Sequence, residues 1–539
     1  MLGIDYVSPL PPVRSGIADY SADLLPELAK RCDLRLVHLP GQELGAEWAE
    51  CCTTVGPAQL GDDGRLPLYQ MGNNHHHQAV WGLAMERPGV LTLHDLVLHH
   101  FLIDRTVKGG DYDGYRAQLV ADHGWLGEAA ARPMAWPGGS GAAAQFALPA
   151  HRTLLARQRG VLVHSGWAAD RLREEIPGLR VQDLAMGIPL PPAMDAAAGR
   201  DFRALEGLPL DAPILGSFGF QTPIKRTDVV IRALARPELA GVHLMVAGEV
   251  APILRLEEEA AALGVTDRLH VLGFLPFEKF EAAIAASDLC LNLRYPTAGE
   301  TSASLLRILA VGKPAIVSDH AQSAELPDAG LIKVPLGEGE DEVLAQRLRS
   351  LLDDPESLER MGAAARQHIE THHRLAAAAE AVLDACSAWQ DATPLSRGEA
   401  VVPVDPPPPT TLVWDDLPGE LEVSGAETPW PEGERRELVI ELHNRSIARW
   451  LAAERGDGGI ALEISLERGA ADGVPASSDE GASPGRWLGL PRDLEPGESH
   501  RFTYRVRRPP GSVRLSIRPH VLGRLSLSGL GGPVWDADI

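Results

Sequence analysis

The chain has 539 residues, of which 45% are hydrophobic and 23% are charged. This is the composition of an ordinary globular protein, and it excludes a largely disordered chain. The length exceeds what a single hydrophobic core holds together, so we expect about three domains. The formal net charge of −24 repels phosphate backbones and excludes a general nucleic-acid binder, while leaving room for one local basic site for a diphosphate.

The cysteines and the apolar runs indicate the compartment. The five cysteines are scattered and form no paired CxxC pattern, so the sequence predicts neither a disulfide framework nor a zinc site. Met1 leads directly into a strand-like segment, and no uncharged apolar run approaches the roughly 18 residues of a spanning helix. We therefore expect a cytoplasmic protein without a signal peptide or an integral membrane segment, for which peripheral membrane contact remains open.

Apolar runs alternate with amphipathic helical segments through the first 200 residues. The predicted strands lie at residues 2–7, 34–39, 67–71, 90–94, 161–164 and 181–186. This alternation is typical of a parallel sheet covered by helices, which displays its functional groups at the carboxyl ends of the strands. Residues 187–208 are rich in Pro, Gly and Ala, and they predict a hinge to a second domain.

Candidate binding residues follow three of these first strands. Arg14 and Gly16 end the loop after the first strand, at a helix N-terminus that favours an anion, although Gly16 could be a plain turn glycine. His94 and Asp95 end the strand at 90–94, at the rim of the predicted sheet. His164 ends the strand at 161–164, where it either supports the cleft or packs structurally.

Other histidines carry less information. Residues 75–77 are three consecutive histidines, whose side chains point in different directions and cannot all reach one ion. We therefore expect a loop with one histidine facing the cleft. His99 and His100 are expected on the surface of a helix.

The second domain repeats the alternation of strands and helices. Its strands are predicted at residues 213–220, 242–248, 269–274, 289–294, 315–317 and 331–334, and two helices at 340–352 and 356–389 close the region. Lys225 lies just before a helix, where an ammonium complements a diphosphate. Arg294 follows a strand and is a candidate second cation, whereas Glu249 ends a strand and is expected to face a base or ribose.

The segment at residues 292–318 reads as strand, loop, helix and strand. At its loop-to-helix junction, Gly299, Glu300, Thr301 and Ser302 place a carboxylate, two hydroxyls and unpaired backbone N–H groups at a helix N-terminus. In an open α/β sheet this is where nucleotides and phosphates are held. The alternative is a capped helix that binds no ligand.

The run PTAGETSASLLRILAVGKP resembles the donor-sugar loop and helix of family 4 glycosyltransferases, which have the GT-B fold. That family usually carries two Glu separated by seven residues. Glu300 matches the first with an offset of one residue, and Arg307 stands where the second belongs. Lys225 lies six residues after Gly219, as in the family's glycine, arginine and lysine motif, but Phe220 replaces the arginine.

The resemblance extends over about residues 1–389 and implies two Rossmann-like domains, at 1–200 on the acceptor side and 201–389 on the donor side. The loop at Gly16 is similar to the family's first glycine loop, and His94 to its cleft histidine. The implied activity is retaining transfer of a sugar from a nucleotide-diphosphate donor to a glycan or lipid-linked acceptor. His94 and Glu300 would be the catalytic residues, although His94 could instead be a structural residue bonded to a loop carbonyl.

The remaining site residues are expected from their places at strand ends and loops, together with this resemblance. Donor contacts are expected from the glycines and polar residues of the loops, and acceptor contacts from Arg14, Asp95 and His164. The expected donor contacts are Gly16, Lys225, Glu249, Arg294, Gly299, Thr301 and Ser302. No metal or other cofactor is implied, since the DxD string at residues 111–113 lies far from the donor motifs. A nucleotide-sugar epimerase or hydrolase on the same fold, or a non-catalytic sugar-binding or scaffold protein, are the alternatives.

The last part of the chain changes its period. Residues 390–410 are rich in proline and predict a stiff linker. Beyond it, segments such as ELVIEL, HRFTYRV and SVRLSIR alternate apolar and polar residues between Gly/Pro turns. They predict an antiparallel, loosely immunoglobulin-like β-sandwich over residues 411–539. It shows no catalytic cluster, so glycan binding, partner docking and structural support remain open.

Overall fold

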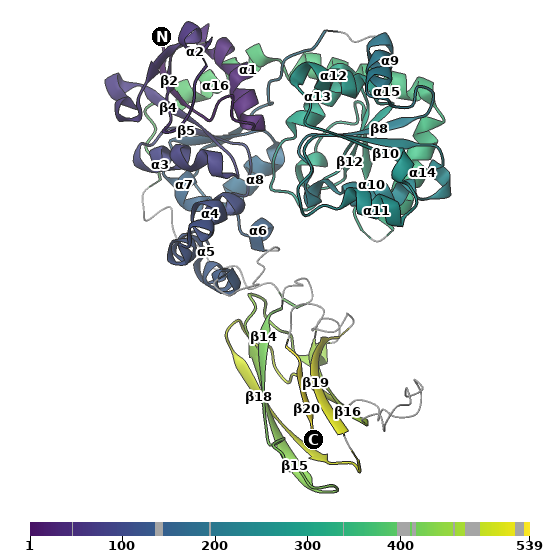
Figure 1. The fold of residues 1–539 in the computed structure, drawn as a ribbon. Helices are drawn as coiled ribbons and strands as arrows, with labels where there is room; N and C mark the ends of the chain where they lie inside the picture. Colours follow the sequence, from purple (N-terminus) through teal and green to yellow (C-terminus); the bar gives the residue numbers. More distant parts are fainter. Residues whose placement is uncertain are drawn as a thin grey trace. The chain divides into compact units, whose positions relative to one another are not determined.

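The computed structural model describes the chain except residues 46, 135–143, 193–195, 338, 396–409, 412–416, 456–458, 469–485, 512 and 523–532. Most of the predicted proline-rich linker therefore lies outside the described residues. The chain forms two compact units, residues 1–105 with 151–401 and residues 106–150 with 402–539. Figure 1 shows the elements of both units. None of the described helices is both long and apolar enough to cross a membrane.

The first lobe of the first unit is built on a parallel sheet in the order β3-β2-β1-β4-β5-β6-β7. Its strands are β1 (Gly3–Val7), β2 (Asp33–Val37), β3 (Thr53–Val55), β4 (Leu66–Met71), β5 (Val90–Leu93), β6 (Gly160–Val163) and β7 (Val181–Asp183). All residues of β4, β5 and β6 are buried. Helices that cover both faces of a parallel sheet explain why these strands are nearly continuous apolar runs.

The helices of the first lobe follow the predicted alternation with the strands. They are α1 (Gly16–Ala29), α2 (Glu47–Cys51), α3 (Gln78–Glu86), α4 (His99–Arg105), α7 (Arg152–Ala156) and α8 (Gly166–Glu175). Ser15 caps α1 by accepting from the N–H of Ile17, and Ser165 caps α8 by accepting from the N–H of Ala168. Each cap fixes the point at which the chain turns from a strand end into a helix.

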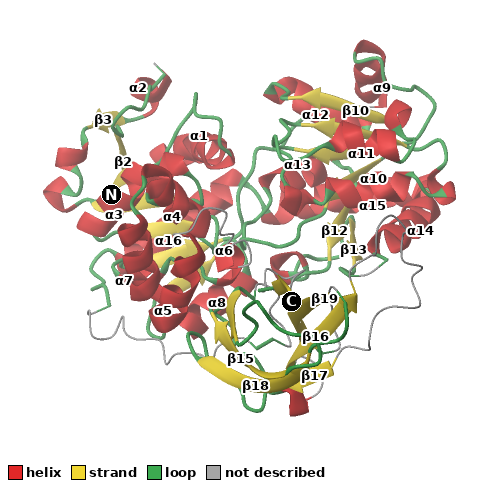
Figure 2. Ribbon diagram, turned by 60° about the horizontal axis from the view of Figure 1, so that its bottom comes forward, coloured by secondary structure: helices red, strands yellow, loops and turns green. Residues whose placement is uncertain are grey.

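The second lobe has a parallel sheet in the order β10-β9-β8-β11-β12-β13. Its strands are β8 (Ile214–Phe218), β9 (His243–Ala247), β10 (Leu269–Gly273), β11 (Leu289–Asn292), β12 (Ala315–Ser318) and β13 (Leu331–Val334). Its helices include α10 (Thr227–Leu234), α11 (Leu256–Ala262), α12 (Phe277–Ala286), α13 (Ala303–Val311) and α14 (Glu340–Leu352) (Figure 2). The predicted pair of Rossmann-like domains is thereby confirmed.

In both sheets the strand order reverses at one point. The reversal falls between β1 and β4 in the first sheet and between β8 and β11 in the second. Open α/β sheets bind ligands outside the carboxyl ends of the strands at such a switch point. The fold therefore marks the loops after these four strands as the place for a site.

The closing helices differ from the sequence prediction in one respect. The predicted single helix at 356–389 is wrong, because the chain forms α15 (Pro355–His372) and α16 (Leu375–Trp389) instead. The break arises because the backbone at His373 bonds to the hinge, where the N–H of Ile188 donates to the His373 carbonyl at 2.9 Å. After the break, α16 packs against α1 of the first lobe, where Arg31 pairs with Glu380 at 3.3 Å.

The hinge helix α9 (Ala196–Leu205) belongs by its packing to the second lobe. It packs against α12, and a Cβ at Gly199 would lie 2.6 Å from the Ala285 carbonyl oxygen. The glycine therefore allows the two helices to approach each other closely.

The second unit contains α5 (Tyr112–Met134), α6 (Ala144–Ala147) and two antiparallel sheets. One sheet has the order β14-β15-β18 and the other β17-β16-β19-β20. Their strands are β14 (Gly419–Ser424), β15 (Arg435–Asn444), β16 (Ile460–Arg468), β17 (Arg486–Gly489), β18 (Ser499–Arg507), β19 (Val513–Val521) and β20 (Trp535–Asp538). Alternate residues of β15, such as Leu438 and Leu442, join Ile464 of β16 and Ile517 of β19 in one core shared by the two sheets.

Candidate active site

The candidate site residues lie on loops that follow the carboxyl ends of strands in both lobes. Arg14 follows β1, and His94 and Asp95 follow β5 in the first lobe. Lys225 follows β8, and the loop from Arg294 to the N-terminus of α13 follows β11. These are the strand ends at and beside the two switch points, where the fold predicts a ligand site.

The loop after β11 is docked on the first lobe. The N–H of Val97 donates to the carbonyl of Ala298 at 2.9 Å, and Thr301 Oγ1 donates to the carbonyl of His164 at 3.3 Å. Gly299 has a φ of 77°, and a Cβ there would lie 2.5 Å from Leu96 Cβ. Only glycine therefore fits between the loop and the first lobe. The predicted residues of the two lobes are brought to one place.

Arg294 and Glu300 form the charged centre of this loop. Arg294 Nη1 donates to Glu300 Oε1 at 2.6 Å, and its Nη2 donates to Ser302 Oγ at 3.0 Å. The second carboxylate oxygen of Glu300 accepts from Thr297 Oγ1 at 3.1 Å and from the N–H of Ala298 at 3.0 Å. The two charged side chains are only 13% and 14% exposed. Such charge-assisted bonds fix both groups in a preorganised geometry.

Lys225 is held beside the turn that follows β8. Its ammonium donates to the carbonyl of Phe218, and a Cβ at Gly219 would lie 2.9 Å from Lys225 Nζ. Burial, with Arg294 adding to it and Glu300 opposing it, lowers the pKa of Lys225 well below its ordinary value. Lys225 therefore belongs electrostatically to the same centre as Arg294 and Glu300. A further negative charge at this centre would raise the pKa of Lys225 again.

Asp95 faces this centre from the first lobe. Its Oδ2 accepts from the N–H of Asn73 at 2.8 Å. Burial and the neighbouring Glu300 carboxylate raise the pKa of Asp95 to about 7, against the influence of Arg294. Near neutral pH this carboxyl can therefore either donate or accept a hydrogen bond.

His94 lies in a small aromatic group behind Asp95. Its Nε2 bonds to Gln70 Oε1 at 2.9 Å, so the partner is a side-chain amide and not a loop carbonyl. Its ring lies 5.1 Å from the rings of Tyr20 and of His164. Burial lowers the pKa of His94 well below its ordinary value and that of His164 to about 4, so both imidazoles are neutral at pH 7.

Several buried polar atoms around this centre have no hydrogen-bond partner among the described residues. They are Tyr20 Oη, Gln70 Nε2, His77 Nε2, Thr92 Oγ1, His164 Nε2, Arg294 Nε and Gln322 Oε1. Nearly all buried polar groups in folded proteins are paired, so such a group of atoms calls for an explanation. Donors and acceptors of this kind suit a ligand with many hydroxyl groups.

The predicted residues Arg14, Gly16 and Glu249 take other positions. Arg14 Nη1 donates to Glu249 Oε1 at 2.9 Å in an exposed pair between the lobes, and its guanidinium stacks on Phe274 at 4.6 Å. Gly16 begins α1, and the space next to its Cα is open. Arg14 and Glu249 therefore meet each other and are not part of the buried charged centre.

Arg307, at the place of the family's second glutamate, joins the two lobes. Its Nη2 donates to Asp23 Oδ2 on α1 at 2.9 Å, and its guanidinium stacks on Phe277 at 4.3 Å. Burial raises the pKa of Asp23 and of Asp19, and Arg307 opposes both shifts.

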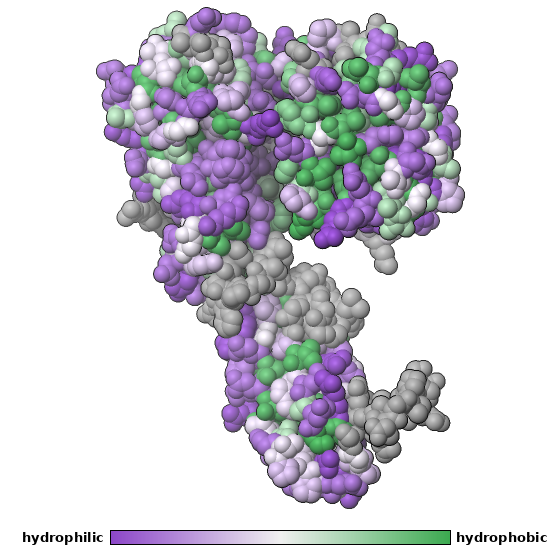
Figure 3. All heavy atoms as spheres, viewed as in Figure 1, coloured by the Kyte–Doolittle hydropathy of each residue, from purple (hydrophilic) through white to green (hydrophobic). Residues whose placement is uncertain are grey.

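Phe220, at the place of the missing arginine, is 55% exposed. Figure 3 shows a large apolar patch on the visible face of the second lobe.

Among the histidines at residues 75–77 and at the start of α4, His77 and His99 are buried. Residues 75–77 form a short 3-10 turn, in which only His77 is fully buried, and burial lowers its pKa to about 3. His77 lies near Gly72, where a Cβ would meet His77 Cε1 at 3.0 Å and Asp95 Oδ2 at 3.2 Å. The prediction that His99 lies on the surface is wrong: it is 0% exposed, because the start of α4 packs on this turn.

Sequence reasoning missed four residues that surround the site. Tyr20 and Gln70 contact His94, Asn73 bonds to Asp95, and Gln322 Nε2 donates to the carbonyl of Glu300 at 2.8 Å. Gln70 left a signal, because it is the polar residue in the otherwise apolar strand LPLYQM. The others lie on separate elements, and no local pattern distinguishes them.

Known proteins resemble the chain in sequence over the second lobe and in fold more widely. Residues 200–368 match the family model of glycosyl transferases group 1. Sucrose-phosphate synthase from Thermosynechococcus elongatus superposes with a TM-score of 0.55 at 17% identity, covering 73% of this chain and 100% of that one. HepE from Anabaena, solved in complex with UDP and glucose, gives 0.52 at 13% identity, with coverages of 72% and 100%. No curated protein matches the sequence.

The sequence match and the fold lead to the same class of protein. The matched segment contains β8, Lys225, the charged loop after β11 and α13. The structural neighbours share the arrangement of two Rossmann-like lobes. Residues 200–368 thus match the group 1 glycosyltransferase model, and with the first lobe they have the fold of two Rossmann-like lobes that these glycosyltransferase structures share.

Proposed function

We propose that the chain is a retaining family 4 glycosyltransferase that moves a sugar from a nucleotide-diphosphate donor to an acceptor hydroxyl in glycan or cell-envelope biosynthesis. One observation carries the proposal. Lys225 and Arg294 follow the two strands at the switch point of the second sheet, and the Glu300 they flank faces Asp95 of the first lobe. A diphosphate at the second lobe would then place its sugar against the first.

The cations supply the chemistry that sugar transfer needs. The leaving diphosphate gains negative charge as the glycosidic bond breaks, so Lys225 and Arg294 would stabilise the transition state more than the ground state. The α13 N-terminus, capped by Ser302, adds backbone N–H groups to the same anion. The leaving phosphate itself can take the acceptor proton, so the proposal requires no separate general base.

The first lobe would hold the sugar. His94, with Gln70 and Tyr20 around it, and the unpaired atoms of His77 and His164 offer hydrogen bonds to sugar hydroxyls. Asp95 can donate or accept near neutral pH. Glu300 would orient the sugar while Arg294 holds its carboxylate in place. Arg14 and the open space beside Gly16 would lie on the acceptor's path.

We further propose that transfer needs no metal ion. Among the described residues, the group with metal-ligand spacing is Glu422, Glu441 and His443, which belongs to the second unit and not to these loops. The cations Lys225 and Arg294 would take the role that a divalent ion has in other transferases. Activity that survives EDTA would support this, and activity restored only by a divalent ion would refute it.

The experiment that tests the proposed function is an incubation of the full chain with radiolabelled UDP-, GDP- and ADP-sugars and a mixture of glycan and lipid-linked acceptors. Because HepE was solved with UDP-glucose, UDP-glucose is the first donor to try. Transfer predicts free nucleotide with a labelled product that keeps the anomeric configuration of the donor. An isomerised donor, or tight binding without turnover for every donor, would contradict it.

A further inference from the structure

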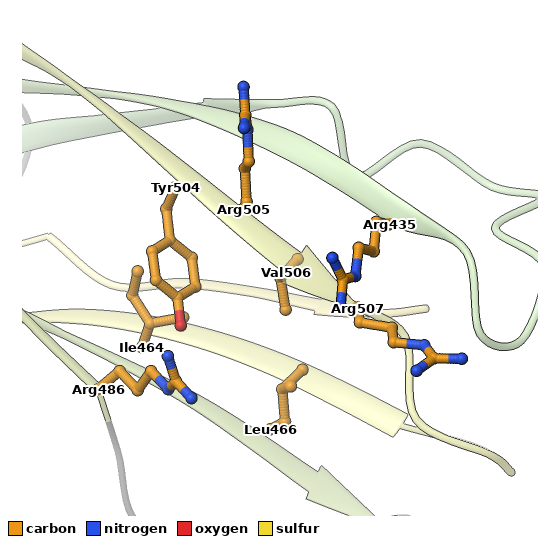
Figure 4. Close-up of a pocket in the computed structure, with 8 residues that line it drawn as sticks. All are labelled: Arg435, Ile464, Leu466, Arg486, Tyr504, Arg505, Val506 and Arg507. Carbon is orange, nitrogen blue, oxygen red and sulfur yellow. The ribbon is translucent and has the colours of Figure 1, made fainter.

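The β-sandwich contains a recess lined by arginines. It has a volume of about 380 Å³ and lies between the strands β15 and β18 of one sheet and β16 and β17 of the other. Figure 4 shows Tyr504 and Val506 pointing from β18 toward Ile464 and Leu466 on the facing sheet. The recess therefore has a largely apolar floor, and its size is within the range of small-ligand sites.

Four arginines line this recess, although the side chain of Arg505 points away from it. They are Arg435 on β15, Arg486 on β17, and Arg505 and Arg507 on β18, and none of the described lining residues carries a carboxylate. In a chain with a formal net charge of −24 this is a marked local excess of positive charge. Arg435 and Arg507 are also directly paired across the two strands. Like charges at directly opposite positions repel, so an anion bound near Arg435 would reduce this repulsion.

The four arginines differ in whether other residues of the protein bond to their side chains. Arg505 Nε donates to Glu437 at 2.9 Å, and Arg507 Nε donates to the carbonyl of Gly433 at 2.9 Å. The side chains of Arg435 and Arg486 make no hydrogen bond or ion pair with any residue that the structure describes. They reach the recess from opposite sheets. Both can therefore turn their full set of donors to a ligand.

We propose that this recess binds an anionic saccharide, meaning a sugar unit that bears a carboxylate or a phosphate. The planar fork of a guanidinium matches the oxygens of both anions, and Arg435 and Arg486 would grip the charged group from two sides. The ring would lie against Tyr504 and the apolar floor, which presents the flat apolar contact that the face of a pyranose fits. The site is independent of the proposed transfer reaction and of the residues that carry it.

The concave shape favours a saccharide over a membrane. A planar lipid surface is bound by protruding basic and apolar side chains, whereas a recess between two sheets admits a single projecting group. Arg505 is 84% exposed and points away from the recess, so it would serve the approach of the ligand more than its grip. This attraction weakens as salt rises.

The test is calorimetric titration of the full chain with the galacturonate trimer and mannose 6-phosphate, each compared with its neutral counterpart, the trimethyl ester and mannose. We expect at least one charged ligand to bind, with an affinity about tenfold or more above that of its neutral counterpart. The double variant Arg435→Gln, Arg486→Gln should lose about tenfold or more of that affinity. Arg501→Gln, which removes an exposed arginine of β18 outside the recess, should change nothing.

Three results would overturn the proposal. They are equal affinity for charged and neutral sugars, an equal loss in the Arg501→Gln control, and, in a parallel titration with phosphatidylglycerol vesicles, binding to the vesicles and to none of the sugars. Thermal unfolding of each variant checks that the sandwich is intact, and we expect it to be unchanged because the two arginines have no partners to lose among the described residues. Nucleotide binding by the lobes is measured on the same samples. A failure of saccharide binding by the recess can therefore be distinguished from a failure of the proposed transferase function.

Discussion

The charged centre of the lobes and the arginine recess of the sandwich both concentrate positive charge, but they hold it differently. Arg294 is locked to Glu300 and Ser302, and Lys225 is bonded to a carbonyl oxygen. In the recess, Arg435 and Arg486 have no partner among the described residues. A preorganised cation needs little reorganisation when charge develops in a transition state. An arginine without a partner, in contrast, loses side-chain entropy when a ligand orders it. The first arrangement suits catalysis, and the second suits binding alone.

The largest expected difference between the two regions concerns the loss of one arginine. Arg294→Ala should lower kcat/KM about 100-fold or more and destabilise the fold by about 3–5 kcal/mol, because it leaves the buried Glu300 without its charge partner. Arg435→Gln should cost no stability. Chemical denaturation and steady-state kinetics measure both effects, with the exposed Arg232→Ala as the control in the second lobe. Equal stability losses for Arg294→Ala and Arg435→Gln would contradict the comparison.

A second prediction concerns Asp95 and pH. Its pKa is raised to about 7 in the folded chain from an ordinary value of 3.8. The folded state thus holds this proton more tightly than the unfolded state, so stability falls as the pH rises from about 4 to about 7. Asp95→Asn should therefore stabilise the protein at pH 8, by up to about 4 kcal/mol, and the gain should vanish near pH 4.

Unfolding free energies of the wild type and Asp95→Asn between pH 4 and pH 8 measure this effect. Asp170→Asn removes an exposed carboxylate of the same lobe and is the matched control. A pH-independent difference for Asp95→Asn would mean that the carboxyl is not held protonated by burial and Glu300. The same substitution should lower activity, as expected where a strained site is kept for function.

A third prediction concerns the link between the lobes at Arg307 and Asp23. The pair is 12% and 27% exposed, so its coupling should exceed that of a surface pair and reach about 1–2 kcal/mol in a double-mutant cycle. Arg307→Ala should also lower stability at neutral pH, because Asp23 and Asp19 would lose the cation that stabilises their charged forms. A coupling near zero would show that Phe277 alone holds Arg307.

The smallest effect is expected for the exposed pair Arg14 and Glu249. The side chains are 69% and 54% exposed, and such pairs contribute less than about 1 kcal/mol and are screened by salt. Arg14→Ala should therefore leave thermal unfolding almost unchanged. An effect on the acceptor KM with donor KM unchanged would assign Arg14 to the acceptor's path, whereas unchanged kinetics would leave it a surface residue.

The architecture could be predicted from the sequence because the residues of each strand and helix largely determine that element. Apolar runs with loops between them placed the strands, and Lys225, Arg294 and Glu300 stand at strand ends where a parallel sheet gathers its functional groups. The predictions that failed concern features that depend on contacts between residues far apart in the sequence. The break between α15 and α16 arises from the pairing of His373 with Ile188, and no feature of an Ala-rich helix reveals it.

The surroundings of the site were hidden for the same reason. Tyr20 reaches His94 from α1, and Gln322 reaches Glu300 from the chain after β12. Asp23 meets Arg307 across 284 residues of sequence. The recess of the sandwich likewise combines four strands. Three of them contribute its arginines, which look like ordinary surface charges when each strand is read alone.

Calorimetric titration with UDP and with GDP is the decisive experiment on the charged centre, with the wild type, Lys225→Ala and Arg232→Ala compared under one set of conditions. If Lys225 holds the diphosphate, one nucleotide binds the wild type and the Arg232→Ala control alike, and Lys225→Ala weakens it by about tenfold or more. Equal affinity of the wild type and Lys225→Ala for the nucleotide that binds would contradict the assignment of the diphosphate to this centre.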